Sequence, residues 1–277
     1  MSRRYLSPTR RAYLSDLADE IANEHFPDAV VDPRRIIEAE GITSSYNDYG
    51  NYFDGMLECR DGRFHIFCNT SRSSGPNTPR ARFTLAHELG HYFIDEHRHS
   101  LLAGRGEHFS KSEFESSNLI EQEADTFASS LLLPPTRFRQ AAKKSRRGLR
   151  AVVGLSDSFG TSLTATAIRY VQENLYMCAL IKWSPSEYSW KWLSHEARKR
   201  GYKKTIEAMG DIPEGSATAR ALAGEEAPAG GHFESGSTAS FWFPFVSAGA
   251  EDDILLIEQS IPLGRFGALT FLYPAAP

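Results

Sequence analysis

Residues 82–94 read Arg-Phe-Thr-Leu-Ala-His-Glu-Leu-Gly-His-Tyr-Phe-Ile, a run that is apolar on almost all sides. Such a run predicts a buried helix. Within it, His87 and His91 stand four residues apart, so both imidazoles leave one face of the helix, one turn apart. Polar groups buried in this way need hydrogen-bond partners or a metal ion. The stretch therefore predicts a buried helix around which its domain is organised.

The five residues His87-Glu88-Leu89-Gly90-His91 have the HExxH spacing of a zinc site. The two histidines supply two nitrogen ligands to one metal ion. Glu88 lies roughly 100° around the helix from His87, outside the ligand face but within reach of a water on the metal. We therefore predict that His87 and His91 are metal ligands and that Glu88 is the catalytic base. The alternative is a solvated helix with two histidines, which the apolar flanks disfavour.

A catalytic zinc normally has three protein ligands and one open position. His97 has the spacing of the third histidine in HExxHxxGxxH sites, but Ile94 stands where that turn needs glycine. The better candidate is Glu121, in a second predicted helix over residues 119–133. Asp125 lies one turn after Glu121, where a carboxylate could orient a ligand histidine.

Glu123 lies roughly 200° from Glu121 around this helix. We therefore expect it to point away from the metal, and we expect Glu123→Ala to leave the metal content near normal. For Glu121 and Asp125 taken alone, a solvated acidic face is the alternative.

Two motifs together resemble the ImmA/IrrE family of metallopeptidases. They read Phe83-Thr-Leu-Ala-His-Glu-Leu-Gly-His91 and Glu121-x-Glu-Ala-Asp-x-Phe-Ala-x-x-Leu-Leu-Leu-Pro134. The resemblance is specific over about residues 11–135 and weak thereafter. Leu133 stands where the family usually has Met, which is a volume-conserving change.

The resemblance implies a zincin-like peptidase with a gluzincin-type site, in an intracellular protease that cleaves repressors bearing a helix-turn-helix in phage or stress responses. Carried over to this sequence, it gives His87, His91 and Glu121 as zinc ligands, Glu88 as the base and Asp125 as their support. Mn²⁺ or Fe²⁺ could occupy such a site in place of Zn²⁺.

The composition predicts a soluble globular protein. Its 277 residues are 41% hydrophobic, which is enough for a large core and suits two domains. No apolar stretch is long enough for a membrane span, and the N-terminus lacks the apolar core of a signal peptide, so we expect a cytoplasmic protein. Three cysteines, Cys59, Cys68 and Cys178, are expected to be buried thiols.

Further helices and strands are predicted in the N-terminal domain, residues 1–135. Helices are predicted over residues 9–26 and 33–39, and a strand is expected within residues 42–53. A hairpin joins residues 56–60 to 63–67 through Asp61-Gly62, the preferred two-residue turn. Its register pairs Cys59 with Phe64 and Glu58 with His65, so we expect Glu58 to be the partner of His65. Residues 98–115 are expected to form an active-site loop in which His99 and His108 are solvated.

The middle segment, residues 136–174, begins with basic side chains and no acidic ones over residues 137–150. It continues as a short helix, a turn at residues 160–162 and a longer helix, a pattern that resembles a helix-turn-helix. The basic residues could contact DNA, although the net charge of -4 argues against a general nucleic-acid binder. A basic helical module that packs on the peptidase is the alternative.

The C-terminal domain, residues 175–277, is predicted to be β-rich, which makes the whole fold α+β. Trp242 is expected in its core. Family members can carry a GAF-like sensor here. Strands are predicted over residues 176–183, 188–193, 240–246, 254–258 and 266–273, with a flexible loop over residues 210–231.

Three functions follow from these features. The leading hypothesis is a zinc endopeptidase that cleaves a helix-turn-helix repressor. The second is a DNA-binding regulator whose metal site is structural or sensory. The third is a binding module that senses a small molecule through the β-rich part and sequesters a repressor without cutting it. Glu88 favours the first, because a structural zinc site has four ligands and no use for a base.

Overall fold

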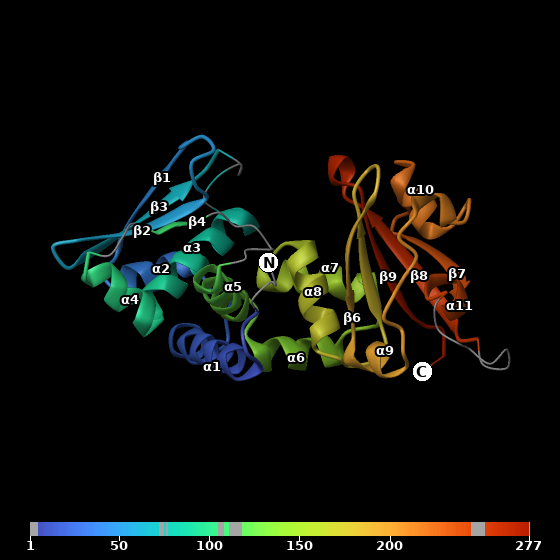
Figure 1. Cartoon of the computed structure of the whole chain (residues 1–277), viewed down its shortest axis with the longest axis horizontal. Helices are drawn as coiled ribbons and strands as arrows, with labels where there is room; N and C mark the ends of the chain where they lie inside the picture. Colours follow the sequence, from blue (N-terminus) through green and yellow to red (C-terminus); the bar gives the residue numbers. More distant parts are fainter. Residues whose placement is uncertain are drawn as a thin grey trace. The chain divides into compact units, whose positions relative to one another are not determined.

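The computed structural model describes residues 5–71, 75, 77–104, 108–110, 118–244 and 253–276. Helices combine with two separate sheets, so the fold is α+β, as predicted (Figure 1). The chain divides into two compact units. Unit 1 comprises Met1–Phe138 and Asp157–Ser162, and unit 2 comprises Arg139–Ser156 and Leu163–Pro277. The three-part division at residues 135 and 174 stays a prediction.

Unit 1 is a four-stranded sheet covered by helices. The strand order is β1-β3-β2-β4, with β1 parallel to β3 and the other pairs antiparallel. Helix α3 packs between this sheet and α5, and α1 packs against α5. The elements are α1 (Pro8–His25), α2 (Pro33–Ala39), β1 (Thr43–Asn47), β2 (Gly55–Arg60), β3 (Arg63–Asn69), α3 (Pro79–Phe93), α4 (Asp95–Leu102), β4 (His108–Ser110), α5 (Leu119–Leu132) and α6 (Pro135–Lys144), which continues into unit 2.

The hairpin of β2 and β3 has the predicted register, with Cys59 opposite Phe64 and Glu58 opposite His65. Its turn residues Asp61 and Gly62 have φ values of 50° and 74°, as a turn with two left-handed residues requires. A set of apolar side chains of the hairpin lies on one face of the sheet and enters the core of unit 1. The buried members are Leu57, Phe64, Ile66 and Cys68, and Cys59 packs against them.

The expected pairing of His65 with Glu58 is wrong. Both ring nitrogens of His65 bind hydroxyls of the neighbouring strand β1, at 2.7 Å from Thr43 Oγ1 and 2.9 Å from Ser45 Oγ. Glu58 forms an ion pair with Arg60 at 2.8 Å instead. The backbone register alone did not reveal that β1 lies on the other side of β3 and offers better partners.

Unit 2 is a five-stranded antiparallel sheet with helices against both faces. Its strand order is β6-β5-β9-β8-β7, and every residue of the central strand β9 up to Tyr273 is buried. Trp242 is fully buried, as predicted. The elements are α7 (Leu149–Phe159), which ends in unit 1, α8 (Leu163–Gln172), β5 (Ala179–Trp183), β6 (Tyr188–Leu193), α9 (His195–Lys199), η1 (Met209–Asp211), α10 (Ala217–Leu222), β7 (Phe233–Thr238), α11 (Ala239–Trp242), β8 (Leu255–Pro262), η2 (Gly264–Phe266) and β9 (Ala268–Pro274).

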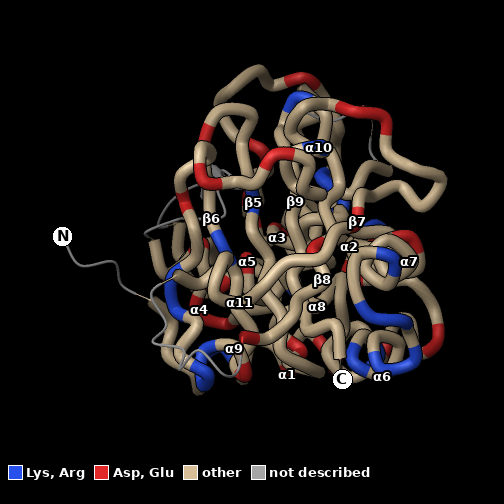
Figure 2. Tube along the Cα trace, turned by 90° about the vertical axis from the view of Figure 1, so that its right-hand side faces the viewer, with Lys and Arg blue, Asp and Glu red and all other residues tan. Residues whose placement is uncertain are grey.

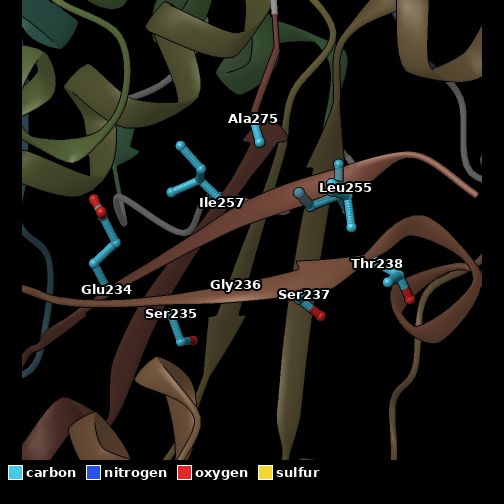
Figure 3. Close-up of a pocket in the computed structure, with 9 residues that line it drawn as sticks. Glu234, Ser235, Gly236, Ser237, Thr238, Leu255, Ile257 and Ala275 are labelled. Atoms are coloured by element: carbon cyan, nitrogen blue, oxygen red, sulfur yellow. The ribbon is translucent and has the colours of Figure 1, made fainter.

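The edge of this sheet carries an open pocket along β7 and β8, shown in Figure 3. Glu234, Ser237, Leu255 and Ile257 are among its lining residues. The carboxylate of Glu234 accepts a hydrogen bond of 2.7 Å from Gln259 Nε2.

Three expectations about loops and strands need correction. The strand predicted over residues 240–246 begins as helix α11, and its residues 245 and 246 lie outside the described part of the chain. The loop predicted over residues 210–231 contains α10, which Ser216 caps by accepting a hydrogen bond from Ala219 N. The loop predicted over residues 98–115 begins inside α4. His99 is exposed as expected, whereas the side chain of His108 lies outside the described residues.

No helix in the described ranges has both the length and the apolar character needed to cross a membrane.

Candidate metal centre

Helix α3 brings the HExxH residues into the interior of unit 1. Thr78 caps its first turn by accepting a hydrogen bond of 3.2 Å from Ala81 N, and Pro79 occupies the first helical position. The helix is buried from Thr84 to Tyr92. His87, Glu88 and His91 therefore lie in a site largely shielded from solvent, with exposures of 1%, 0% and 0%.

Helix α5 lies close enough to α3 to add a third ligand. Asn118 caps α5 by accepting a hydrogen bond from Ile120 N. The buried residues of α5, which include Ala124, Phe127 and Leu131, lie along one side of the helix. A Cβ at Gly90 would lie 3.1 Å from Ala124 Cα, which is tighter than most packed side chains tolerate. Gly90 therefore permits the close approach of the two helices. That approach brings Glu121 of α5 near the two histidines of α3.

His87, His91 and Glu121 converge. Their ligand atoms all lie within 4.8 Å of one another, and no other group of three or more His, Cys, Asp or Glu side chains among the described residues is arranged to hold a metal. The Nε2 atoms of the two histidines are 3.1 Å apart. The carboxylate oxygens of Glu121 lie 3.3 Å from His87 Nε2 and 3.7 Å from His91 Nε2.

These separations fit a tetrahedral metal ion. With zinc–ligand bonds of about 2.0–2.2 Å, two tetrahedral ligand atoms lie about 3.3–3.6 Å apart. The donor set is two imidazole nitrogens and one carboxylate, which is the ligand set of a catalytic rather than a closed structural site. The predicted ligands are thus brought together with spacing and chemistry suited to a divalent metal ion.

Asp125 lies where the sequence predicts it. Its Oδ1 atom is 2.9 Å from His87 Nδ1. Because a carboxylate accepts hydrogen bonds, Nδ1 carries a hydrogen, and in the neutral ring that a metal requires the lone pair of Nε2 faces Glu121 and His91.

The charges around His87 favour a cation. Burial alone would lower the pKa of His87, but hydrogen bonds with Asp125 and Glu121, together with the charge of Glu88, raise it to about 10. Three carboxylates therefore stabilise positive charge at this position, which is the electrostatic condition that a divalent ion requires.

Glu88 occupies the space beside the first residue of β2. A Cβ at Gly55 would lie 2.4 Å from Glu88 Oε1 and 2.6 Å from Thr84 Cγ2. The absence of a side chain at Gly55 therefore gives the Glu88 carboxylate its place between α3 and the sheet.

His97 is not a metal ligand in this arrangement. It is buried behind His91, with its Nδ1 atom 3.1 Å from His91 Nδ1 and its Nε2 atom 3.2 Å from Glu123 Oε2. Glu123 does face away from the ligands, as expected from its helical position, but it meets His97 there. Sequence reasoning missed this pair because it expected a loop from residue 98 and no helix that begins at Asp95. The acidic residues Asp95 and Glu96 before His97 are typical of a first helical turn and could have indicated that helix.

Comparisons with known proteins agree with the predicted resemblance. Residues 72–170 match the peptidase family described as the IrrE N-terminal-like domain. No curated protein matches the chain. A solved structure of a Mycobacterium tuberculosis transcriptional regulator is similar over 96% of this chain and 78% of its own, with a TM-score of 0.56 and 14% identity, which shows a shared fold. Residues 72–170, which include the HExxH helix and Glu121, are therefore similar to the IrrE N-terminal-like domain of this peptidase family.

Proposed function

We propose that the chain is a zinc-dependent endopeptidase with a zincin-like catalytic unit. The observation that carries this proposal is the convergence of His87, His91 and Glu121, with ligand spacing, beside the fully buried carboxylate of Glu88. The peptidase family match supports the same conclusion. Mn²⁺ or Fe²⁺ could serve in the cell, because the ligand set accepts either ion.

Glu88 and Asp125 have different roles in the proposed hydrolysis. A bound metal would supply a Lewis acid that polarises the scissile carbonyl and acidifies the attacking water. Glu88 accepts the proton of that water and passes it to the leaving amine nitrogen. Asp125 holds His87 in the tautomer that presents Nε2 to the metal.

The decisive experiment is Glu88→Gln. This substitution keeps the size of the side chain and leaves both histidines in place, so zinc content and melting temperature should stay near the wild-type values. Cleavage should fall by about 10²- to 10⁴-fold, the range for a lost general base. Glu20→Gln, at an exposed position of α1, is the matched control. Undiminished cleavage by the Glu88→Gln protein, with zinc retained, would refute the mechanism.

The substrate we propose is a repressor with a helix-turn-helix, cleaved in a stress, phage or mobile-element response. The family resemblance supports this choice, and such a substrate would require the enzyme to act in the cytoplasm. The test is incubation of the zinc-loaded protein with repressors encoded beside its gene. Discrete fragments support cleavage, whereas tight binding without fragments in wild type and Glu88→Gln alike supports sequestration instead.

A second candidate function is DNA contact through the basic segment 137–150, with the following helices as a helix-turn-helix. Figure 2 shows Lys and Arg gathered along α6 and the start of α7. Arg139 is paired with Glu173 at 3.1 Å, but other basic side chains of the segment are exposed. These are Lys143, Lys144, Arg146, Arg147 and Arg150.

Phosphate contacts would make DNA affinity fall steeply with salt, and replacing Lys143, Lys144, Arg146 and Arg147 by Ala should flatten that slope. The lack of measurable binding at low salt would remove this candidate.

For unit 2 we propose a GAF-like sensor role. What supports it is an antiparallel sheet with helices against both faces, attached to a peptidase. The test is whether a candidate effector raises the melting temperature and changes the cleavage rate together.

A further inference from the structure

Behind the predicted ligand His91, a line of polar contacts, buried at His97 and partly buried beyond it, leads to the N-terminal helix. His91 Nδ1 lies 3.1 Å from His97 Nδ1, and His97 Nε2 lies 3.2 Å from Glu123 Oε2. Arg10 then holds Glu123 with two hydrogen bonds, from Nε to Oε1 at 2.9 Å and from its terminal nitrogen to Oε2 at 2.7 Å. The line joins α3, α4, α5 and α1, in that order.

The chemistry of these groups fixes the direction of each hydrogen bond. Glu123 is a carboxylate held by a guanidinium, so it accepts, and His97 Nε2 must donate. In a neutral imidazole the other nitrogen is then an acceptor, so His97 Nδ1 accepts a hydrogen from His91 Nδ1. His91 therefore keeps its lone pair on Nε2, the atom that lies 3.7 Å from Glu121 Oε1 on the ligand side.

We propose that His97, Glu123 and Arg10 are positioning residues, which hold His91 in the ring orientation and tautomer that present Nε2 to the metal. This inference rests on the proposed metal site and adds three residues to it. It differs from the expectation, drawn from helical spacing alone, that Glu123 has no part in metal binding.

The two ligand histidines are thus supported in different ways. His87 relies on the single carboxylate of Asp125, whose side chain is 26% exposed. His91 relies on His97, whose side chain is 4% exposed, and on the Glu123 carboxylate, which forms an ion pair with Arg10. Metal-bound histidines usually donate their second nitrogen to a carboxylate or carbonyl, and loss of that partner typically lowers metal affinity by about 10- to 100-fold.

Arg10 also provides a matched control. The same guanidinium binds Glu96 at 3.1 Å and Glu123 at 2.7 Å. The Glu96 side chain is 65% exposed, and its electrostatic interaction with His97 is weaker than its interaction with Arg10. Removal of the Glu96 carboxylate therefore removes one partner of Arg10 and a weak, solvent-screened charge near His97, but none of the hydrogen bonds that lead to His91.

The experiment measures zinc affinity by chelator competition on the full chain, with the visible spectrum of the Co²⁺-substituted protein as a second readout of ligand geometry. Glu123→Ala and His97→Leu should weaken zinc by about 10- to 100-fold and alter the Co²⁺ bands. Glu96→Ala should change zinc affinity by at most about fivefold, as for an exposed ion pair, and leave the bands unchanged. Arg10→Ala should fall between these limits.

A conservative replacement separates positioning from filling of space. His97→Gln keeps one donor and one acceptor, so it should bind zinc more tightly than His97→Leu. Equal affinities for the two variants would mean that His97 only fills the core. If both His97 variants fail to fold, Glu123→Ala and Arg10→Ala decide the question by the same measurements.

The inference and the proposed function fail in different ways. A wild-type chain that binds no metal refutes the proposed function. A wild-type chain that binds zinc and cleaves, with Glu123→Ala equal to it in zinc affinity and Co²⁺ spectrum, refutes only the positioning role.

Discussion

Gly55→Ala should displace the catalytic base while leaving the metal ligands in place. The new Cβ would lie 2.4 Å from Glu88 Oε1, where an ordinary contact is 3.4 Å or more, so the carboxylate must move by about 1 Å. Thr84 Cγ2, at 2.6 Å, blocks part of the space into which α3 could adjust. Because Gly55 does not need a left-handed backbone, the effect comes from crowding alone.

The size of the effect follows from this displacement. Overpacking of an interior site costs about 1–3 kcal/mol, which lowers Tm by roughly 2–12 °C in a domain of this size. A reacting group misplaced by about 1 Å costs about 10²-fold in rate. Zinc affinity should stay near the wild-type value, since the ligands lie on α3 and α5 and not on β2.

The assay compares Tm, zinc content and cleavage rate for Gly55→Ala and for Gly236→Ala, where a Cβ meets nothing within 4 Å. Only Gly55→Ala should lose cleavage with zinc retained. If zinc and cleavage are lost in parallel, the substitution has moved α3 as a whole. If neither changes, the proposed role of Gly55 in seating Glu88 is wrong.

Two further predictions concern packing and reactivity. Gly90→Ala places a Cβ 3.1 Å from Ala124 Cα, so α3 and α5 should separate by a few tenths of an ångström. Zinc affinity should then fall by about tenfold. An unchanged zinc affinity would contradict the argument that Gly90 is needed for the close approach of the two helices. Burial raises the pKa values of the Cys68 and Cys178 thiols to about 12. Iodoacetamide at pH 8 should therefore alkylate Cys59 alone in the folded protein, as peptide mass spectrometry can check, and early labelling of Cys68 would show that the core of unit 1 opens.

Local signals predicted much of unit 1. The turn Asp61-Gly62 fixed the hairpin register, and the four-residue spacing of His87 and His91 placed both rings on one face of α3. Glu121 followed from the helical spacing of residues 119–133. In each case the deciding interaction lies within about one helical turn or one strand pair, so the sequence carries it directly.

Interactions between distant segments were not readable in this way. His65 took its partners from β1, and His97 took Glu123 from α5, because packing rather than sequence spacing brings those elements together. In unit 2 the aromatic run at Phe241 has the composition of a strand. Its neighbour Ser240 donates its backbone N–H to Asp253 at 2.8 Å, and the chain turns into α11 there. Tertiary contacts override local propensity at such positions.

The two hydrogen bonds between Arg10 and Glu123 join residues that are 113 positions apart in the chain, so the ribosome makes the two partners at different times. At about 5–20 residues per second, a ribosome needs roughly 6–23 s to add the second partner after the first. Until then the nascent α1 lacks its partner on α5, although the HExxH helix is already made. We therefore expect stalled chains that end before residue 123 to capture zinc poorly, so that metal loading is postponed until the whole site has emerged.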